Sequence, residues 1–199
     1  MSEVRSTFRL GKGDAAPAFS LPDANGSIVT LQDVAGPRGL LVAFVCNHCP
    51  FVVHLADALG DLARTLAAEG VHTVAINSND TANYPQDAPA LMPTFAEKHR
   101  WEFPYLVDES QAVALAYGAA CTPDFFLFDE KLRLFYTGQF DHSRPRSNQT
   151  ADGADMLTAA RLMIDGKAAP ARSYPSSGCN IKWKAGNQPQ WWNSGVSPA

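Results

Sequence analysis

The sequence has 199 residues, 46% of them hydrophobic, and a formal net charge of -4. Enough apolar material for a full core excludes a chain that is disordered throughout, and the small negative charge excludes a nucleic-acid-binding protein. No apolar run of about 18 residues occurs, so we expect no bilayer-spanning segment and no membrane partner. The first ten residues carry scattered charges and no apolar stretch, which argues against a signal peptide and predicts a reducing, cytoplasmic location.

The first part of the sequence predicts a β-hairpin followed by a buried strand. Residues 17–21 and 28–31 are apolar runs separated by Asn25-Gly26, a strong hairpin signal. The continuous apolar run 39–45 is typical of a central strand that is covered on both faces.

Helices and strands then alternate. The helix that follows Pro50 is indicated by leucines at three- and four-residue spacing and ends at Gly70. Further elements are expected in the following ranges: strand 71–77, helix 90–99 with Leu91, Met92 and Phe95 inward, strand 105–107, helix 111–117, strands 124–129 and 132–137, and helix 155–164. This order predicts an α/β fold with a mixed central sheet flanked by helices.

We predict one domain over residues 13–167, preceded by an N-terminal arm of residues 1–12. Residues 168–199 are polar and rich in Pro, Gly, Ser and Asn. They predict an irregular C-terminal extension packed on the domain rather than a second domain.

Cys46-Asn-His-Cys49 stands where the buried strand ends and the helix begins. A helix N-terminus stabilises a thiolate, and only the thiolate attacks a disulfide. We therefore expect Cys46 at the exposed edge as a nucleophile of lowered pKa, with Cys49 as the thiol that resolves the mixed disulfide. His48 between them could add a charge or a hydrogen-bond donor.

The same Cys-x-x-Cys spacing occurs in structural zinc sites, which need a second pair of ligands. Cys121 and Cys179 are single and far apart in the sequence, so we favour redox use over structural metal. Thr122-Pro123 directly precedes the strand 124–129, where a proline costs no ladder hydrogen bond. If this peptide bond is cis, the loop can present the Thr122 backbone to an extended partner.

These features together resemble the thioredoxin fold: a strand ending in Cys-x-x-Cys, a helix, and a Thr-Pro that opens a strand hairpin. The string at residues 13–23 resembles the redoxin branch, which includes alkyl hydroperoxide reductases and thiol-specific antioxidant proteins. The strings at 44–51, 121–124 and 178–183 are similar to bacterial thioredoxin-family proteins with a CNHCP motif. The resemblance covers about residues 10–190.

The resemblance implies a thiol–disulfide oxidoreductase with antioxidant activity and no cofactor. It makes Cys46 the attacking thiol, Cys49 the resolving thiol and Pro123 the cis proline, with His48 as a fourth catalytic residue. Substrate-binding positions are then Asn47, Pro50 and Thr122. The partner is expected to be a protein or small-molecule disulfide or thiol.

Two departures from the family patterns matter. Peroxiredoxins of this branch place Thr or Ser three residues before the reactive cysteine, and here that residue is Ala43, so peroxidase activity is the weaker alternative. Thioredoxins carry a buried Asp six residues before the first cysteine, and here that residue is Leu40. Proton removal from Cys49 must then depend on another group.

The two remaining cysteines leave alternatives open. Under the resemblance Cys121 lies beside the Cys46 sulfur, and Cys179 could fold back over the site, so both are candidate additional redox thiols; a buried free cysteine is the plainer interpretation of Cys121. Together with Cys46, His48 and Cys49 they could instead form a soft copper or zinc site, which makes a metal-binding module the alternative function. Trp191-Trp192 near the polar end predicts either a homodimer contact or a tail packed on its own domain.

Overall fold

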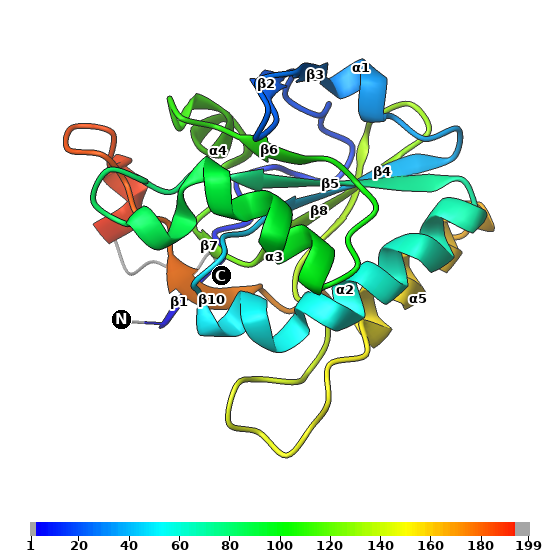
Figure 1. Ribbon diagram of the computed structural model, residues 1–199. Coiled ribbons are helices and arrows are strands. Elements are labelled where there is room, and N and C mark those ends of the chain that lie inside the picture. The colour runs from blue at the N-terminus through cyan, green and yellow to red at the C-terminus, as the bar shows by residue number, and fades with distance from the viewer. Residues whose placement is uncertain (1–2, 194–199) are drawn as a thin grey trace.

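The structure is a computed structural model and describes residues 3–193. It is built around one twisted sheet with helices on both faces (Figure 1). Its strands are β1 (Glu3–Arg5), β2 (Ser20–Pro22), β3 (Ile28–Thr30), β4 (Gly39–Phe44), β5 (Val71–Asn77), β6 (Tyr105–Val107), β7 (Cys121–Thr122), β8 (Asp124–Asp129), β9 (Leu134–Thr137) and β10 (Ser177–Asn180). Its helices are α1 (Leu31–Val34), α2 (Pro50–Ala68), α3 (Met92–Lys98), α4 (Ala112–Tyr117) and α5 (Ala154–Ile164), with short 3-10 turns η1 (Pro85–Asp87), η2 (Pro89–Leu91) and η3 (Gln190–Asn193).

The central sheet has the order β6–β5–β4–β8–β9. Strand β4 pairs antiparallel with β8 over its whole length, from Gly39↔Asp129 to Phe44↔Asp124, and β8 pairs antiparallel with β9. Strand β5 pairs parallel with β6, and it lies beside β4, where Val45 N donates to Ile76 O at 3.0 Å. Strands β4 and β5 therefore end at the same edge of the sheet, joined by the α2 crossover.

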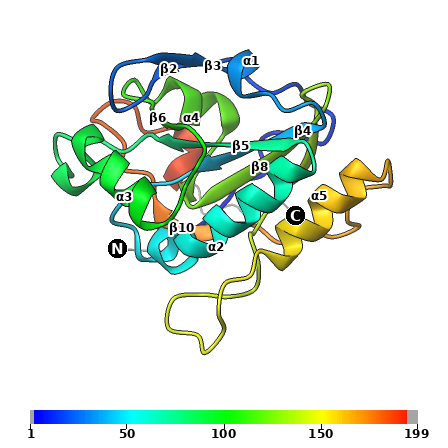
Figure 2. The same cartoon turned by 45° about the vertical axis from the view of Figure 1, so that its right-hand side comes forward.

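The two faces of the sheet follow from the alternation of side chains along β4. Leu41 and Ala43 belong to a core with α2, α3 and α5, whereas Leu40 and Phe44 belong to a core with α1, α4 and the β2–β3 hairpin. Figure 2 shows α2 and α5 side by side on one face and the hairpin on the other. All six residues of β4 are buried, which confirms the doubly covered strand and the mixed α/β fold class.

Several expected elements differ in their boundaries by a few residues, and one helix shows the consequence for burial. The helix expected at 90–99 spans Met92–Lys98 and follows the 3-10 turn that begins at Pro89. Met92 is buried as expected, but Leu91 is 48% exposed because it lies in the 3-10 turn and not in the helix. Among the described residues, no helix has the combined length and apolarity to cross a membrane.

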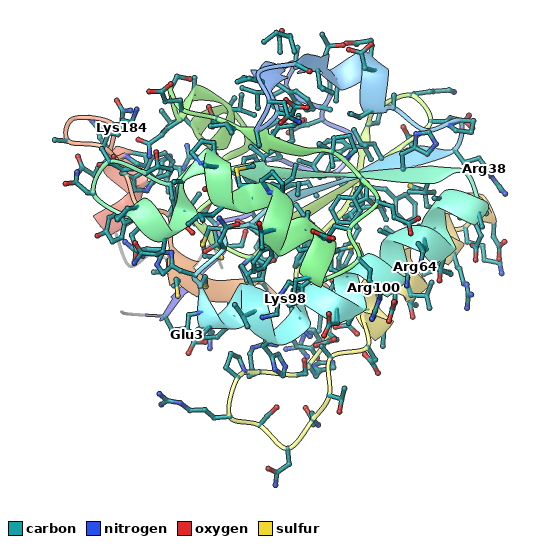
Figure 3. The ribbon with its side chains drawn as sticks, in the orientation of Figure 1. Glu3, Arg38, Arg64, Lys98, Arg100 and Lys184 are labelled. Atoms are coloured by element: carbon teal, nitrogen blue, oxygen red, sulfur yellow. The ribbon has the colours of Figure 1, made fainter. Side chains whose placement is uncertain are left out.

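A second, smaller sheet ties the two ends of the chain together. Strand β10 lies between β1 and β7, with Glu3 opposite Cys179 on one side and Thr122 opposite Cys179 on the other. Figure 3 shows Glu3 beside this strand, near the start of α2. The sequence predicted neither β1, β7 nor β10, because each is short and polar and has no hydrophobic alternation.

Candidate active site

The Cys46–Cys49 loop lies at the edge of the sheet where β4 and β5 end. Helix α2 begins at Pro50, so Cys49 is its N-cap residue and Cys46 lies three positions earlier. The exposed fraction is 1% for Cys46 and 0% for Cys49. The expectation that Cys46 lies at an exposed edge is therefore wrong, because the loop folds inward and the position at the helix N-terminus belongs to Cys49.

Thr122 contacts both cysteines of the motif. The Thr122–Pro123 peptide bond is cis, as the resemblance implied. Thr122 Oγ1 lies 3.5 Å from Cys46 Sγ, and Cys49 Sγ lies 3.0 Å from Thr122 O, to which it donates when it is protonated. The cis-proline loop is thus the second wall of the site.

The carboxylate of Asp87 in η1 is fully buried and accepts hydrogen bonds from the Cys46–Cys49 loop. Its Oδ1 accepts the backbone N–H groups of Asn47 at 2.8 Å and His48 at 3.2 Å. Its Oδ2 accepts from His48 Nδ1 at 2.6 Å and from Asn79 Nδ2 at 2.8 Å. Because a carboxylate only accepts hydrogen bonds, His48 Nδ1 carries a proton and Nε2 is left for other partners.

Sequence reasoning missed Asp87. It noted that Leu40 stands where thioredoxins place a buried Asp, and it found no replacement; the structure supplies one from a different segment of the chain. Nothing around residues 84–87 marks a buried acid. The available signal was the Asn-rich segment at the end of β5: Asn77 Nδ2 donates to Asp87 O at 2.9 Å and so holds η1 against the site.

The charges of the two motif thiols are arranged differently from our expectation. Burial raises the pKa of Cys46, and its hydrogen bond to Cys49 and the nearby Asp87 carboxylate raise it further. Hydrogen bonds from Cys179 and then from Cys46 lower the pKa of Cys49 despite its burial. The expected low-pKa nucleophile at Cys46 is thus incorrect for the reduced protein, because the negative charge of the pair is more stable on Cys49.

The other two cysteines occupy opposite faces of the small sheet. Cys179 is directly opposite Thr122, and residues opposite one another in an antiparallel pair point to the same face. Cys121 is the preceding residue in β7 and so faces the other way; its thiol donates to Pro123 O at 3.4 Å, and burial raises its pKa. The structure therefore brings Cys179 to the motif thiols and leaves Cys121 on the far face, contrary to the expected position of Cys121 beside the Cys46 sulfur.

Aromatic and polar side chains form the rim of the site. Tyr105 Oη donates to Asn47 Oδ1 at 3.1 Å, and the Tyr84 ring stacks on His48 at a centroid distance of 6.0 Å. Lys182 Nζ lies 5.6 Å from the centre of the Tyr84 ring. Of the expected substrate-binding residues, Asn47 is thus in this rim, whereas Pro50 is the exposed first residue of α2.

The metal-binding alternative rests on a smaller set than the sequence suggested. Among residues 3–193, one group could hold an ion: Cys46, His48 and Asp87, whose ligand atoms lie within 4.8 Å of one another. Cys49, Cys121 and Cys179 are not in this group. His48 and Asp87 are already joined by a hydrogen bond, so an ion would have to displace that proton or use His48 Nε2 instead.

The aromatic end of the chain packs on its own domain in the part that the structure describes. Trp191 lies edge-on to Trp183 at 6.5 Å, and the Arg9 guanidinium lies 5.4 Å from the centre of the Trp191 ring. The side chain of Trp192 lies outside the described residues. A homodimer stays a prediction.

A buried cysteine pair before a helix, faced by a cis proline at the edge of a mixed sheet, defines a thioredoxin-like redox protein. The Redoxin family model matches residues 11–154, and the chain belongs to this family. Over most of its length the chain also resembles solved structures of a peroxiredoxin and of a disulfide oxidoreductase, at low sequence identity. This likeness confirms the thioredoxin-like fold.

Individual relatives agree with this family. The crystal structure of an uncharacterized conserved protein from Geobacillus kaustophilus is 44% identical, has a TM-score of 0.88, and covers 92% of this chain and 97% of its own. A Mycobacterium tuberculosis protein provisionally named a peroxiredoxin is 33% identical over 58% of this chain and 69% of its own length. Peroxiredoxin Bcp of Escherichia coli is 34% identical over 55% of this chain and 65% of its own length. The protein is thus a redox enzyme of the redoxin family.

Proposed function

We propose that this protein is a thiol–disulfide oxidoreductase in which Cys46 forms a mixed disulfide that Cys49 resolves. The observation that carries the proposal is that Thr122 contacts the sulfurs of both Cys46 and Cys49. Each thiol is also a cause of the other's pKa shift, which supports their acting as one pair.

Proton transfer between the two thiols is the step that the sequence left unexplained. In the reduced protein the pKa of Cys46 is raised and that of Cys49 is lowered, so the negative charge of the pair is more stable on Cys49. When a disulfide approaches, Cys49 accepts the Cys46 proton, and the Cys46 thiolate attacks one sulfur of the substrate. The Cys46–substrate bond forms, and the other substrate sulfur leaves as a thiolate.

The second step returns the proton. Cys49 gives its proton to the departing thiolate and attacks Cys46 Sγ, so that the Cys46–Cys49 disulfide forms and the second substrate thiolate is released. His48 contributes by position: Asp87 fixes its ring through Nδ1, and its Nε2 is available to relay a proton to the leaving group.

The covering of the site favours a small substrate. Thr122 is 2% exposed because β10 pairs with the β7 edge that an extended partner would use. The expectation that the Thr122 backbone is presented to an extended partner is therefore not met in this structure. Low-molecular-weight disulfides and thiols fit the nearly closed site better than a protein chain does. The cytoplasmic location of the protein stays a prediction.

The test is a single-turnover reaction of the reduced, metal-stripped protein with bis(2-hydroxyethyl) disulfide, with insulin as the protein substrate for comparison. We expect one Cys46–Cys49 disulfide per chain and two released thiols, with the small disulfide reacting faster than insulin. Cys46→Ser should abolish the reaction, whereas Cys121→Ser, a buried cysteine on the far face, should retain it. No reaction in the wild type, together with recovery of one tightly bound metal ion through Cys46, would overturn the proposal.

A second candidate function is the reduction of hydroperoxides by the same thiols. Thr122 Oγ1 at 3.5 Å from Cys46 Sγ supplies the hydroxyl that Ala43 lacks, and two relatives carry peroxiredoxin names. Hydrogen peroxide in place of the disulfide tests it: a second-order rate no higher than that of a free thiol at the same pH would exclude a peroxidase.

A further inference from the structure

The third cysteine of the site lies on β10, a strand of the C-terminal extension. Strand β10 pairs antiparallel with β7 at the residue before the cis proline, and it carries Cys179 opposite Thr122. Gly178 makes this close approach feasible, because a Cβ added there would lie 2.0 Å from Thr122 O. The C-terminal extension thus holds one of its own thiols against the reactive pair.

Three sulfurs surround Thr122 on one face of the small sheet. The side chain of Thr122 reaches Cys46, its carbonyl reaches Cys49, and Cys179 faces the same way from the neighbouring strand. Cys46, Cys49 and Cys179 are all part of one buried cluster. Both of the other thiols lower the pKa of Cys49, so Cys49 is the member of the cluster that interacts with each of them.

We propose that Cys179 is a second resolving thiol, which takes over the disulfide by exchange to give a Cys49–Cys179 bond and a free Cys46. This inference rests on the proposed function, because it starts from the Cys46–Cys49 disulfide that the reaction produces. The Cys179 thiolate attacks Cys49 Sγ, the Cys49–Cys179 bond forms, and the Cys46–Cys49 bond breaks. The electron pair leaves on Cys46, which takes up the proton that Cys179 released, so no further oxidant is required.

The pKa of Cys179 indicates when this exchange can occur. In the reduced protein the hydrogen bond to Cys49 and burial raise the pKa of Cys179, while Lys182 opposes them. Once Cys49 is in a disulfide it carries no charge, so the largest cause of this elevation disappears, while burial and Lys182 remain. The Cys179 thiol therefore loses its proton more readily after the first disulfide has formed than before it.

Cys179 comes from a different segment of the chain than Asn47 and His48 of the rim. Its strand pairs with β1, a short strand near the start of the chain, with a hydrogen bond from Ser177 Oγ to Glu3 Oε1. A Cys49–Cys179 disulfide moves the oxidised bond away from Cys46 and onto the strand that pairs with β1. A reductant could then act there while Cys46 is free to meet the next substrate.

Peptide mapping of the full chain tests the proposal. The reduced protein is oxidised with one equivalent of diamide, alkylated with N-ethylmaleimide in acid, and digested with trypsin without reduction. Cys46 and Cys49 lie in one tryptic peptide, 39–64, Cys179 lies in 173–182, and Cys121 lies in 101–131. We expect a disulfide-linked pair of 39–64 and 173–182 that carries one maleimide on Cys46, in at least about a tenth of the molecules.

Three variants sharpen the result. Cys46→Ser should still form the Cys49–Cys179 bond with diamide, and Cys121→Ser should behave as the wild type, whereas Cys179→Ser should lose the linked pair. Linked peptides below about 1% in both the wild type and Cys46→Ser would overturn the inference. In that case Cys46-dependent reduction of bis(2-hydroxyethyl) disulfide would leave the proposed function standing, and the converse pattern would remove the function and retain the exchange.

Discussion

Asp87→Asn tests whether the buried carboxylate controls the charge of Cys46. The ligand atoms of Asp87 and Cys46 lie within 4.8 Å of each other, and at an effective dielectric constant of about 20 two unit charges at that distance repel by roughly 3 kcal/mol. This corresponds to about 2 pKa units, so removing the Asp87 charge should lower the pKa of Cys46 by that order. The direction is fixed, because the Asp87 charge raises this pKa.

The same substitution carries a calculable stability cost. If the asparagine oxygen accepts the backbone N–H groups of Asn47 and His48, its amide group faces His48 Nδ1 and Asn79 Nδ2. The imidazole can change tautomer and accept, but Asn79 Oδ1 is already held by the Lys182 N–H at 2.9 Å. One donor-to-donor mismatch remains, worth about 1–3 kcal/mol in the free energy of unfolding.

The measurement is the pH dependence of iodoacetamide alkylation at Cys46, in a background of Cys49→Ser, Cys121→Ser and Cys179→Ser, so that one thiol titrates. Asp108→Asn is the matched control, since Asp108 is also buried and accepts from Ser78 Oγ and Ala114 N, both at 2.9 Å. It should lose stability without moving the Cys46 pKa. A change of less than about 0.3 pKa units in Asp87→Asn would refute the electrostatic reasoning and leave Asp87 a structural role.

Three further outcomes follow from the structure. Cys49→Ser should accumulate a stable mixed disulfide at Cys46 with bis(2-hydroxyethyl) disulfide, seen as a mass increase on the intact chain; rapid turnover instead would show that Cys49 is not the resolving thiol. Gly178→Ala should destabilise the fold by about 1–3 kcal/mol in urea unfolding and suppress the Cys49–Cys179 link, because the added methyl group forces β10 away from Thr122. Burial raises the pKa of Asp124 from 3.8 to about 6, so folding favours its protonated form, and its contribution to stability, on the order of 3 kcal/mol, is present below about pH 4 and lost as the pH rises to about 6. Asp124→Asn should flatten this slope between pH 4 and pH 6, and an unchanged slope would show that another group causes it.

The core of the fold was readable from the sequence because its signals are local and strong. The apolar run that forms β4 and the leucine spacing of α2 each specify one element, and the Asn25-Gly26 turn between β2 and β3 is confirmed by the hydrogen bond from Gly26 N to Asp23 O at 3.1 Å. The Redoxin match and the mixed sheet confirm the fold that these elements predicted.

The site was only partly readable because its remaining parts are set by tertiary contacts. Tertiary contacts decide the thiol charges: burial raises the pKa of Cys46, and Cys179, far away in the sequence, lowers the pKa of Cys49. Asp87 and Cys179 come from polar segments with no periodicity. Asp87 accepts a hydrogen bond from the backbone of Asn47, and Cys179 lies opposite Thr122 in a strand pair, so both depend on contacts between distant segments. Such residues leave no local pattern, so their positions in the fold cannot be predicted from a single sequence.

The late position of β10 in the chain has a consequence for how the protein matures. The five strands of the central sheet and the Cys46–Cys49 loop precede residue 138, whereas β10 spans Ser177–Asn180. A chain still on the ribosome can therefore complete the sheet while the backbone edge of Thr122 is open to any extended polypeptide nearby. Emergence of the last segment closes that edge, and from then on the chain's own strand stands between the cis proline and the other proteins of the cell.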